Sequence, residues 1–215
     1  MSTSRPPLKA IYRALFKTWG SQHWWPGRTR LEVIVGAILT QNTAWTNVEK
    51  AIRRLRSRRA LDLRTLHTVR LATLGEWIRP AGYFRVKARR LRAFTRMVYA
   101  RFGGSLPRLL ALDTAALRRV LLGVNGIGPE TADSILLYAA GRPVFVVDAY
   151  TRRFMMRHRW IGAGASYDGI ARVFTRGLPR DVSLYDEYHA LIVALGKNLC
   201  RTKPLCSECP LQRWL

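Results

Sequence analysis

Helical spacing of apolar residues dominates this chain. Apolar side chains recur every three or four residues in four long segments, namely LEVIVGAILTQ (31–41), WTNVEKAIRRLRSRR (45–59), VKARRLRAFTRMVYARF (86–102) and ETADSILLYAA (130–140). Such spacing puts the apolar side chains on one face of a helix. The one β-branched cluster of note, PVFVVDAY (143–150), is short enough to be a loop that enters a helix. The pattern therefore predicts an all-α fold.

Glycine and proline divide the helical segments into modest lengths joined by tight turns. These breakers are Pro26-Gly27, Pro80-Ala81-Gly82, Gly103-Gly104, Gly141-Arg142-Pro143 and Gly162-Ala163-Gly164. The sequence contains no internal repeat and no low-complexity linker. A chain of 215 residues can bury one good core or two small ones.

Positive charge is the strongest global feature of the composition. The chain has 37 Lys and Arg residues against 13 Asp and Glu, a net charge of +24. This excess favours a polyanionic partner, and nucleic acid is the first candidate. The alternative is an arginine-rich codon usage, although acidic residues would normally balance it.

No apolar run reaches the length of about 18 residues that a membrane helix needs, and the apolar content of 48% argues against disorder. The segment MSTSRPPLKAIYR lacks the apolar core of a signal peptide. We therefore expect a cytoplasmic protein, associated with the nucleoid if bacterial, that does not bind membranes.

A glycine corner separates two helical segments near the middle of the chain. LRRVLLGV (117–124) runs into Asn125-Gly126-Ile127-Gly128, and Pro129 then opens the next helix at a position that proline favours. Glycines before a helix let its unpaired amides approach a phosphate closely. A nucleotide P-loop is excluded because no Gly-Lys-Ser/Thr follows. The alternative is an ordinary turn between two helices.

The sequence around this corner resembles a known family. LLGVNGIGPETADSILLYAAGRPVFVVDAYTRRFMMR resembles the helix-hairpin-helix and the following Gly/Pro-rich loop of the endonuclease III superfamily of DNA glycosylases. LEVIVGAILTQNTAWTNVEKA, IRPAGYFRVKARRL and HALIVALGKNLCRTKPLCSECPL resemble its early helix pair, its Gly-aromatic-x-x-Lys-Ala element and its C-terminal tail. These matches keep the family order over roughly residues 20–215.

The resemblance implies a two-lobed, all-α helix-hairpin-helix fold with a central DNA-binding cleft. One lobe would be a central bundle of residues 31–140 that ends in the helix-hairpin-helix at about 114–140. The other would combine residues 1–30 with 141–215. The implied partner is double-stranded DNA containing a damaged base, and we expect a monomer.

Asp148, in VVDAYTRR, matches the catalytic aspartate of this family. A glycosylase flips a nucleotide out of the duplex and breaks the bond between sugar and base through a cation-like sugar, so a carboxylate near C1′ is required. Asp148 would stabilise that cation and orient or deprotonate the attacking water. The alternative is a purely structural N-cap for a helix over 149–156, and both roles can hold together.

Glu130 occupies the position where bifunctional members carry a lysine, two residues beyond the second hairpin glycine. A lysine amine can attack C1′ and form the imine that leads to strand cleavage, whereas a carboxylate cannot. The sequence therefore predicts base removal without lysine-type lyase activity. Glu130 could face the pocket or only stabilise the first turn of its helix. The sequence does not place Lys197, an amine in the C-terminal tail, relative to the site.

Aromatic residues predict the base pocket. Adjacent tryptophans cannot both face one core from a regular helix, so at least one of Trp24 and Trp25 should line a surface or pocket. Trp24-Trp25-Pro26, followed by TQNT and Trp45, resembles the 3-methyladenine DNA glycosylase III branch, in which such aromatics stack on the extruded base. Indole faces attract a cationic alkylated purine. The alternative is that each tryptophan belongs to a core.

The resemblance also implies DNA contacts. Gln41 matches a residue that fills the gap left by the flipped nucleotide, and Tyr83 or Phe84 matches the opposing wedge. The corner residues Gly126, Ile127, Gly128 and Thr131 are the candidates for contacts to the DNA backbone.

Three cysteines, Cys200, Cys206 and Cys209, resemble the four-thiolate iron–sulfur loop of endonuclease III. Leu215 occupies the fourth position, with five residues between it and Cys209. We therefore favour a loop packed by its own apolar residues, with no metal or cofactor. A zinc or iron–sulfur site is the alternative.

Together these features predict a monofunctional DNA glycosylase that removes alkylated purines such as 3-methyladenine. A mismatch-specific thymine or uracil glycosylase is the nearest alternative. The other alternative is a catalytically inert helix-hairpin-helix DNA-binding module.

Overall fold

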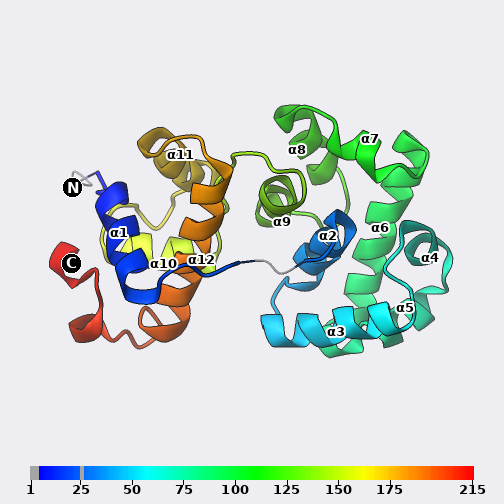
Figure 1. Cartoon of the computed structure of the whole chain (residues 1–215), viewed down its shortest axis with the longest axis horizontal. Coiled ribbons are helices and arrows are strands. Elements are labelled where there is room, and N and C mark those ends of the chain that lie inside the picture. Colours follow the sequence, from blue (N-terminus) through cyan, green and yellow to red (C-terminus); the bar gives the residue numbers. More distant parts are fainter. Residues whose placement is uncertain (1–4, 25–26) are drawn as a thin grey trace. The chain divides into compact units, whose positions relative to one another are not determined.

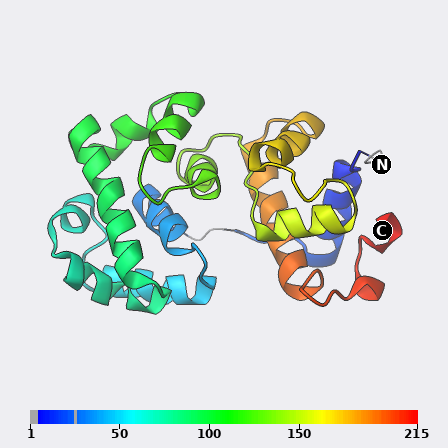
Figure 2. The ribbon, with the colours of Figure 1, turned by 180° about the vertical axis from the view of Figure 1, so that it is seen from behind.

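The computed structural model describes residues 5–24 and 27–215, and this part of the chain contains helices and no strand. The prediction of an all-α fold is confirmed. Internal packing divides the chain into two compact units (Figures 1 and 2). Met1–Trp24 and Pro143–Leu215 form the terminal unit, and Trp25–Arg142 form the central unit.

The central unit is built around helix α2 (Arg30–Leu39), whose residues from Glu32 to Leu39 are all buried. A helix that is apolar on nearly every side needs neighbours all round it. Packed on α2 are α3 (Trp45–Ser57), α6 (Phe84–Phe102), α9 (Pro129–Ser134) and the π-helical turn η2 (Ile135–Ala139). The remaining elements are α4 (Leu63–Thr68), α5 (Leu71–Trp77), η1 (Arg79–Ala81), α7 (Leu106–Leu110) and α8 (Thr114–Leu122).

The terminal unit is built around helix α12 (Val182–Asn198), which packs against α1 (Leu8–Trp19) and α10 (Ala149–Arg157). Its core is aromatic: the Phe145 and Phe174 rings stack with centroids 3.8 Å apart, and Tyr188 meets both edge-on. The Tyr188 hydroxyl donates to the Leu8 carbonyl at 2.9 Å, which ties α1 to α12. The unit also contains α11 (Tyr167–Gly177), η3 (Cys206–Glu208) and η4 (Gln212–Trp214).

Side-chain caps explain where many of these helices begin. In each case a side-chain oxygen accepts the backbone N–H three residues later, which satisfies one of the unpaired amides of the first turn. The capping residues are Thr29, Asp62, Ser105, Asp113, Asp148, Ser166 and Asp181.

Two segments bear on the sequence-based expectations. Residues 143–148 form a loop that enters α10, as predicted. The helix expected over 130–140 changes register at Ile135, where the Ala140 amide donates to the Ile135 carbonyl five residues back. Within the described ranges, no helix has the length and apolar character needed to cross a membrane.

Candidate active site

Asp148 lies at the point where the buried segment Phe145–Val147 ends and α10 begins. Its Oδ1 accepts the Thr151 amide at 2.7 Å, so Asp148 is the N-cap of α10. Only 13% of its side chain is exposed. The positive end of the α10 dipole also favours a negative charge here. The capping role is therefore present, and it holds the carboxylate in one orientation.

His189 is the second contact of this carboxylate. It lies on α12, is buried, and its Nε2 is 3.6 Å from Asp148 Oδ2. Burial alone would raise the pKa of Asp148, but the neighbouring His189 imidazole, followed by the Thr151 amide, lowers it below the ordinary value. Asp148 is therefore an ionised carboxylate in a largely buried setting.

Trp24 and Lys197 extend this cluster within the terminal unit. The Trp24 ring meets His189 edge-on, with centroids 6.3 Å apart. The Lys197 ammonium lies 5.6 Å from the centroid of the Trp24 ring, a cation–π contact. Lys197 and His189 both project from α12. A chain of side-chain contacts through His189 and Trp24 thus links Asp148 to Lys197.

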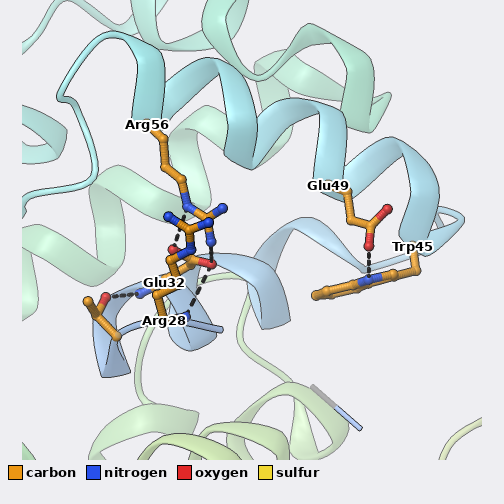
Figure 3. A network of polar contacts seen from close by, with 6 residues as sticks. Arg28, Glu32, Trp45, Glu49 and Arg56 are labelled. Carbon is orange, nitrogen blue, oxygen red and sulfur yellow. Dashed lines mark hydrogen bonds and ion pairs between the residues drawn. The ribbon is translucent and has the colours of Figure 1, made fainter. Parts of the chain in front are cut away.

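In the central unit, Trp45 is the first residue of α3 and is half-buried. Its indole Nε1 donates to Glu49 Oε1 at 2.9 Å, one helical turn later (Figure 3). A buried indole usually needs a partner for its N–H. Glu49 supplies that partner and fixes the ring at the start of α3.

An ion pair anchors the far end of α3 to α2. Arg56 pairs with the buried Glu32, which also accepts the Arg28 amide at 3.4 Å (Figure 3). The Glu32 amide in turn donates to the Thr29 hydroxyl. These contacts therefore join the first turn of α2 to the last turn of α3.

The glycine corner has the helix-hairpin-helix geometry. Gly126 has φ +85°, and a Cβ there would collide with the Arg90 side chain, so only glycine fits. Ile127 is buried, and its amide donates to the Val124 carbonyl at 3.0 Å. Gly128 precedes α9 and faces open space. The buried Ile127 therefore fixes the turn, and the side of the turn at Gly128 is open.

Gln41 joins this corner to the loop between α2 and α3. Its Nε2 donates to the Gly126 carbonyl at 2.9 Å and to the Thr131 hydroxyl at 2.8 Å, and its Oε1 accepts from Arg90. Thr131 is buried. The Gln41 side chain is thus bound at both of its polar atoms.

Lys87 ties together two loops that the sequence matched to DNA contacts. It is only 1% exposed, and its Nζ donates to Leu39 O, Thr43 Oγ1 and Ala81 O at 2.5 to 2.8 Å. The Thr43 hydroxyl donates to the Ala81 carbonyl at 2.6 Å. One buried ammonium therefore holds both the Gln41 loop and the loop before α6.

Tyr83 and Phe84 differ in how far their side chains are exposed to solvent. Tyr83 has left-handed backbone geometry with φ 45°, and 72% of it is exposed. Phe84 is half-buried, with the Arg79 and Arg85 guanidinium groups 5.5 and 5.9 Å from its ring centroid. Tyr83 is therefore the better candidate for a wedge.

Glu130 is exposed in the first turn of α9, and its carbonyl accepts the Ser134 hydroxyl at 2.7 Å. Arg118 holds the following turn through the buried Asp133, at 2.7 and 3.2 Å. Trp25 and Pro26, two of the predicted pocket residues, lie outside the described residues.

The three cysteines do not fit a metal cluster. Cys200 is buried, and its Sγ accepts from Arg157 Nη1 at 3.1 Å. Burial, and then the nearby thiols, raise the pKa of Cys209. No group of three His, Cys, Asp or Glu side chains in residues 5–24 and 27–215 is arranged to hold a metal ion.

Sequence reasoning missed His189 and the burial of Lys87. His189 is 41 positions from Asp148, and no motif joins them. Lys87 lies within the Gly-aromatic-x-x-Lys-Ala element, but lysine is rarely buried. The element's fixed spacing was the one available signal for Lys87.

The helix-hairpin-helix and the capped aspartate define a class that comparison with known proteins also identifies. Residues 35–180 match the HhH-GPD superfamily of base excision DNA repair proteins. The chain belongs to this superfamily and is a DNA repair glycosylase.

Individual relatives cover most of the chain. It is 47% identical over 205 residues to MJ1434 of Methanocaldococcus jannaschii, provisionally named a DNA repair glycosylase, covering 95% of this chain and 93% of that protein. It is 26% identical to endonuclease III of Thermotoga maritima, covering 84% and 79%.

Two solved structures are similar. The 3-methyladenine DNA glycosylase (MagIII) of H. pylori bound to 1,N6-ethenoadenine is 28% identical, with a TM-score of 0.73, covering 88% of this chain and 95% of that one. An endonuclease III–DNA complex is 21% identical, with a TM-score of 0.84, covering 99% and 95%, and supports the fold.

Proposed function

We propose that this glycosylase is monofunctional and hydrolyses the N-glycosidic bond of alkylated purines such as 3-methyladenine in duplex DNA. Asp148 carries the chemical part of the proposal, because it is an ionised, largely buried carboxylate held at both oxygens. The similarity to the H. pylori 3-methyladenine glycosylase supports the choice of base.

In the proposed reaction, the bond between C1′ and the base nitrogen breaks first. Its electron pair leaves with the base, and a cationic alkylated purine becomes neutral as it departs. Asp148 stabilises the cationic sugar through its negative charge. Water then adds to C1′ and loses a proton to Asp148 or to solvent. His189 acts as a positioning residue through its contact with Asp148 Oδ2.

Indole rings supply the proposed selectivity for the base. Trp24 and Trp45 each offer a π-face, and a desolvated cation–π contact contributes about 2 kcal/mol. Glu49 fixes the Trp45 ring, which reduces the entropy lost when a base stacks on it. That Trp25 and Pro26 line the base pocket stays a prediction from the sequence.

Glu130 supports hydrolysis without lysine-type lyase chemistry. Its carboxylate stands where a bifunctional enzyme would present an amine, and a carboxylate forms no imine with C1′. The proposed DNA contacts are the outer side of the Gly126-Ile127-Gly128 turn, Thr131, Gln41 and Tyr83, with Phe84 as the weaker wedge candidate.

One observation favours a second candidate, a neutral base such as thymine or uracil in a mismatch. The Lys197 ammonium already lies over Trp24 and would repel a cationic base stacked on that ring. A thymine-DNA glycosylase of Aeropyrum pernix is 26% identical, covering 83% of this chain and 78% of that protein.

A lesion panel tests both candidates. Purified protein is incubated with duplexes that contain 3-methyladenine, 1,N6-ethenoadenine, thymine opposite guanine, or uracil opposite guanine, and free bases are measured. We expect release of the alkylated purines. Release of pyrimidines alone would establish the second candidate.

Lys197→Met sharpens the comparison. If a cationic base stacks on Trp24, removal of the competing ammonium should raise the rate for 3-methyladenine relative to uracil. Lys203→Met, which removes an exposed ammonium elsewhere, is the matched control.

A further inference from the structure

The outer face of α3 is strongly basic. We propose that it is a second DNA-backbone surface, which binds phosphates of the duplex flanking the lesion. The α3 basic face comprises Lys50, Arg53, Arg54 and Ser57 together with Pro80 of η1. The proposal rests on duplex DNA as the partner and not on the identity of the damaged base.

The position of these residues follows from the amphipathic pattern of α3. Val48, Ala51, Ile52 and Leu55 form its buried face. Lys50, Arg53 and Arg54 are spaced three and four residues apart, so they project together on the opposite, exposed side. With Ser57 and Pro80 they line an open hollow of about 390 Å³. The hollow presents three cations and one hydroxyl.

No carboxylate lines this hollow. Glu49, the one acidic residue of α3, accepts from Trp45, and Arg56 pairs with Glu32. Like charges three or four residues apart destabilise a helix by about 0.2 to 0.5 kcal/mol per pair. A row of phosphates would relieve this repulsion and release counterions. Charge complementarity therefore selects a nucleic-acid backbone.

The surface continues from the loops that the sequence matched to DNA contacts. Pro80 lies three residues before the exposed Tyr83, in the short helix η1 on which α3 packs. The Thr43 hydroxyl and the Lys87 ammonium both donate to the Ala81 carbonyl, and these hydrogen bonds fix the end of η1. All these residues belong to the central unit. A duplex wedged by Tyr83 would thus have a rigid basic surface next to it.

Salt dependence of binding tests the proposal. The full chain and the variant Lys50→Gln/Arg53→Gln/Arg54→Gln are titrated with duplexes of about one and about three helical turns that carry an uncleavable abasic analogue. On the long duplex, the slope of log K against log salt should fall by about 2 to 3, since each phosphate contact contributes about 0.9. On the short duplex the slope should change little.

The matched control is Arg64→Gln/Arg70→Gln/Arg101→Gln, which removes the same charge from other exposed positions of the central unit. It should leave both slopes unchanged. Equal losses in the two triple variants, or equal losses on the two duplexes, would overturn the proposal. If the variant Lys50→Gln/Arg53→Gln/Arg54→Gln lost affinity for RNA duplexes but not for DNA duplexes, that result would also overturn the proposal.

The two proposals fail separately. The abasic analogue contains no base, so the lesion panel has no bearing on this experiment. Single-turnover base release at saturating enzyme should be the same in the α3 variant and in the wild type. A loss there would place these residues in the catalytic site and overturn a backbone-only role.

Discussion

The two oxygens of Asp148 are held by residues of two different helices: Oδ1 accepts the Thr151 amide of α10, and Oδ2 lies 3.6 Å from His189 Nε2 on α12. The carboxylate therefore cannot rotate without losing one contact. A fixed negative charge stabilises a cationic transition state without reorganisation during the reaction.

Asp148→Asn should abolish base release and preserve binding. Asparagine caps helices as well as aspartate does, so stability should change by only a few tenths of a kcal/mol. The loss of the carboxylate charge should lower the single-turnover rate by at least about 100-fold. Binding to the abasic duplex and thermal unfolding are the controls. A variant that still releases base at the wild-type rate contradicts the role of Asp148.

His189→Leu should move the acidic limb of the pH–rate profile to higher pH. His189 supplies the main influence that lowers the pKa of Asp148, so without it burial raises that pKa and protonation begins at higher pH. Asp186, whose pKa is raised to about 6 by burial and then by Glu187, also interacts with His189. Asp186→Asn is therefore measured in parallel. His189→Gln keeps an N–H donor at this position, so it should return the acidic limb part of the way toward its wild-type pH.

Glu130→Lys should introduce imine chemistry. The new amine would lie in the first turn of α9, where bifunctional relatives carry theirs, and could attack C1′. Borohydride reduction should trap this variant on DNA, whereas the wild type and Glu130→Gln should not be trapped. Trapping of the wild type would point to Lys197 and remove the monofunctional assignment.

Trp45→Ala should weaken excision of stacked bases. Base–aromatic stacking contributes about 1 to 3 kcal/mol, so the single-turnover efficiency for 3-methyladenine should fall about 5- to 150-fold. Trp45→Phe should lose less, because a ring remains. Glu49→Gln retains the acceptor for Nε1 and is the control for local structure. Equal activity in all four proteins would exclude Trp45 from the pocket.

Lys87→Met should lower the free energy of unfolding by about 3 kcal/mol, because it leaves three buried acceptors without their ammonium. Burial, and then Arg90, lower the pKa of Lys87 to about 8. Between pH 8 and the ordinary value of 10.5 the unfolded chain binds more protons here, so this group makes stability rise with pH. Urea unfolding should show the wild-type advantage over Lys87→Met growing across this window. A shrinking advantage contradicts the assignment.

Local sequence signals were enough for much of the fold. The spacing of apolar residues predicted the helices, and Asp148 before 149–156 predicted a cap that the structure contains. Gly126 was recognisable from the Gly-Ile-Gly corner before Pro129, and its positive φ beside Arg90 favours glycine there. The π-helical turn at Ile135 was not predicted, because a shift from four- to five-residue hydrogen bonding leaves the apolar pattern of a helix nearly intact.

Contacts between segments far apart in the chain could not be predicted from the sequence. His189 reaches Asp148 through the packing of α12 on α10, which no local pattern records. Lys197 could be named but not located, and its position over Trp24 changes what that ring can offer to a cationic base.

Gln41 has a consequence for how such an enzyme scans DNA. Its side chain already makes three polar contacts inside the protein, to Gly126, Thr131 and Arg90. To enter a duplex, this amide must exchange three existing partners for new ones. If Gln41 fills the gap left by a flipped nucleotide, as the sequence predicts, intact base pairs would offer its amide no replacement partners. The side chain should then stay folded back on undamaged DNA, and discrimination would begin before any nucleotide is extruded.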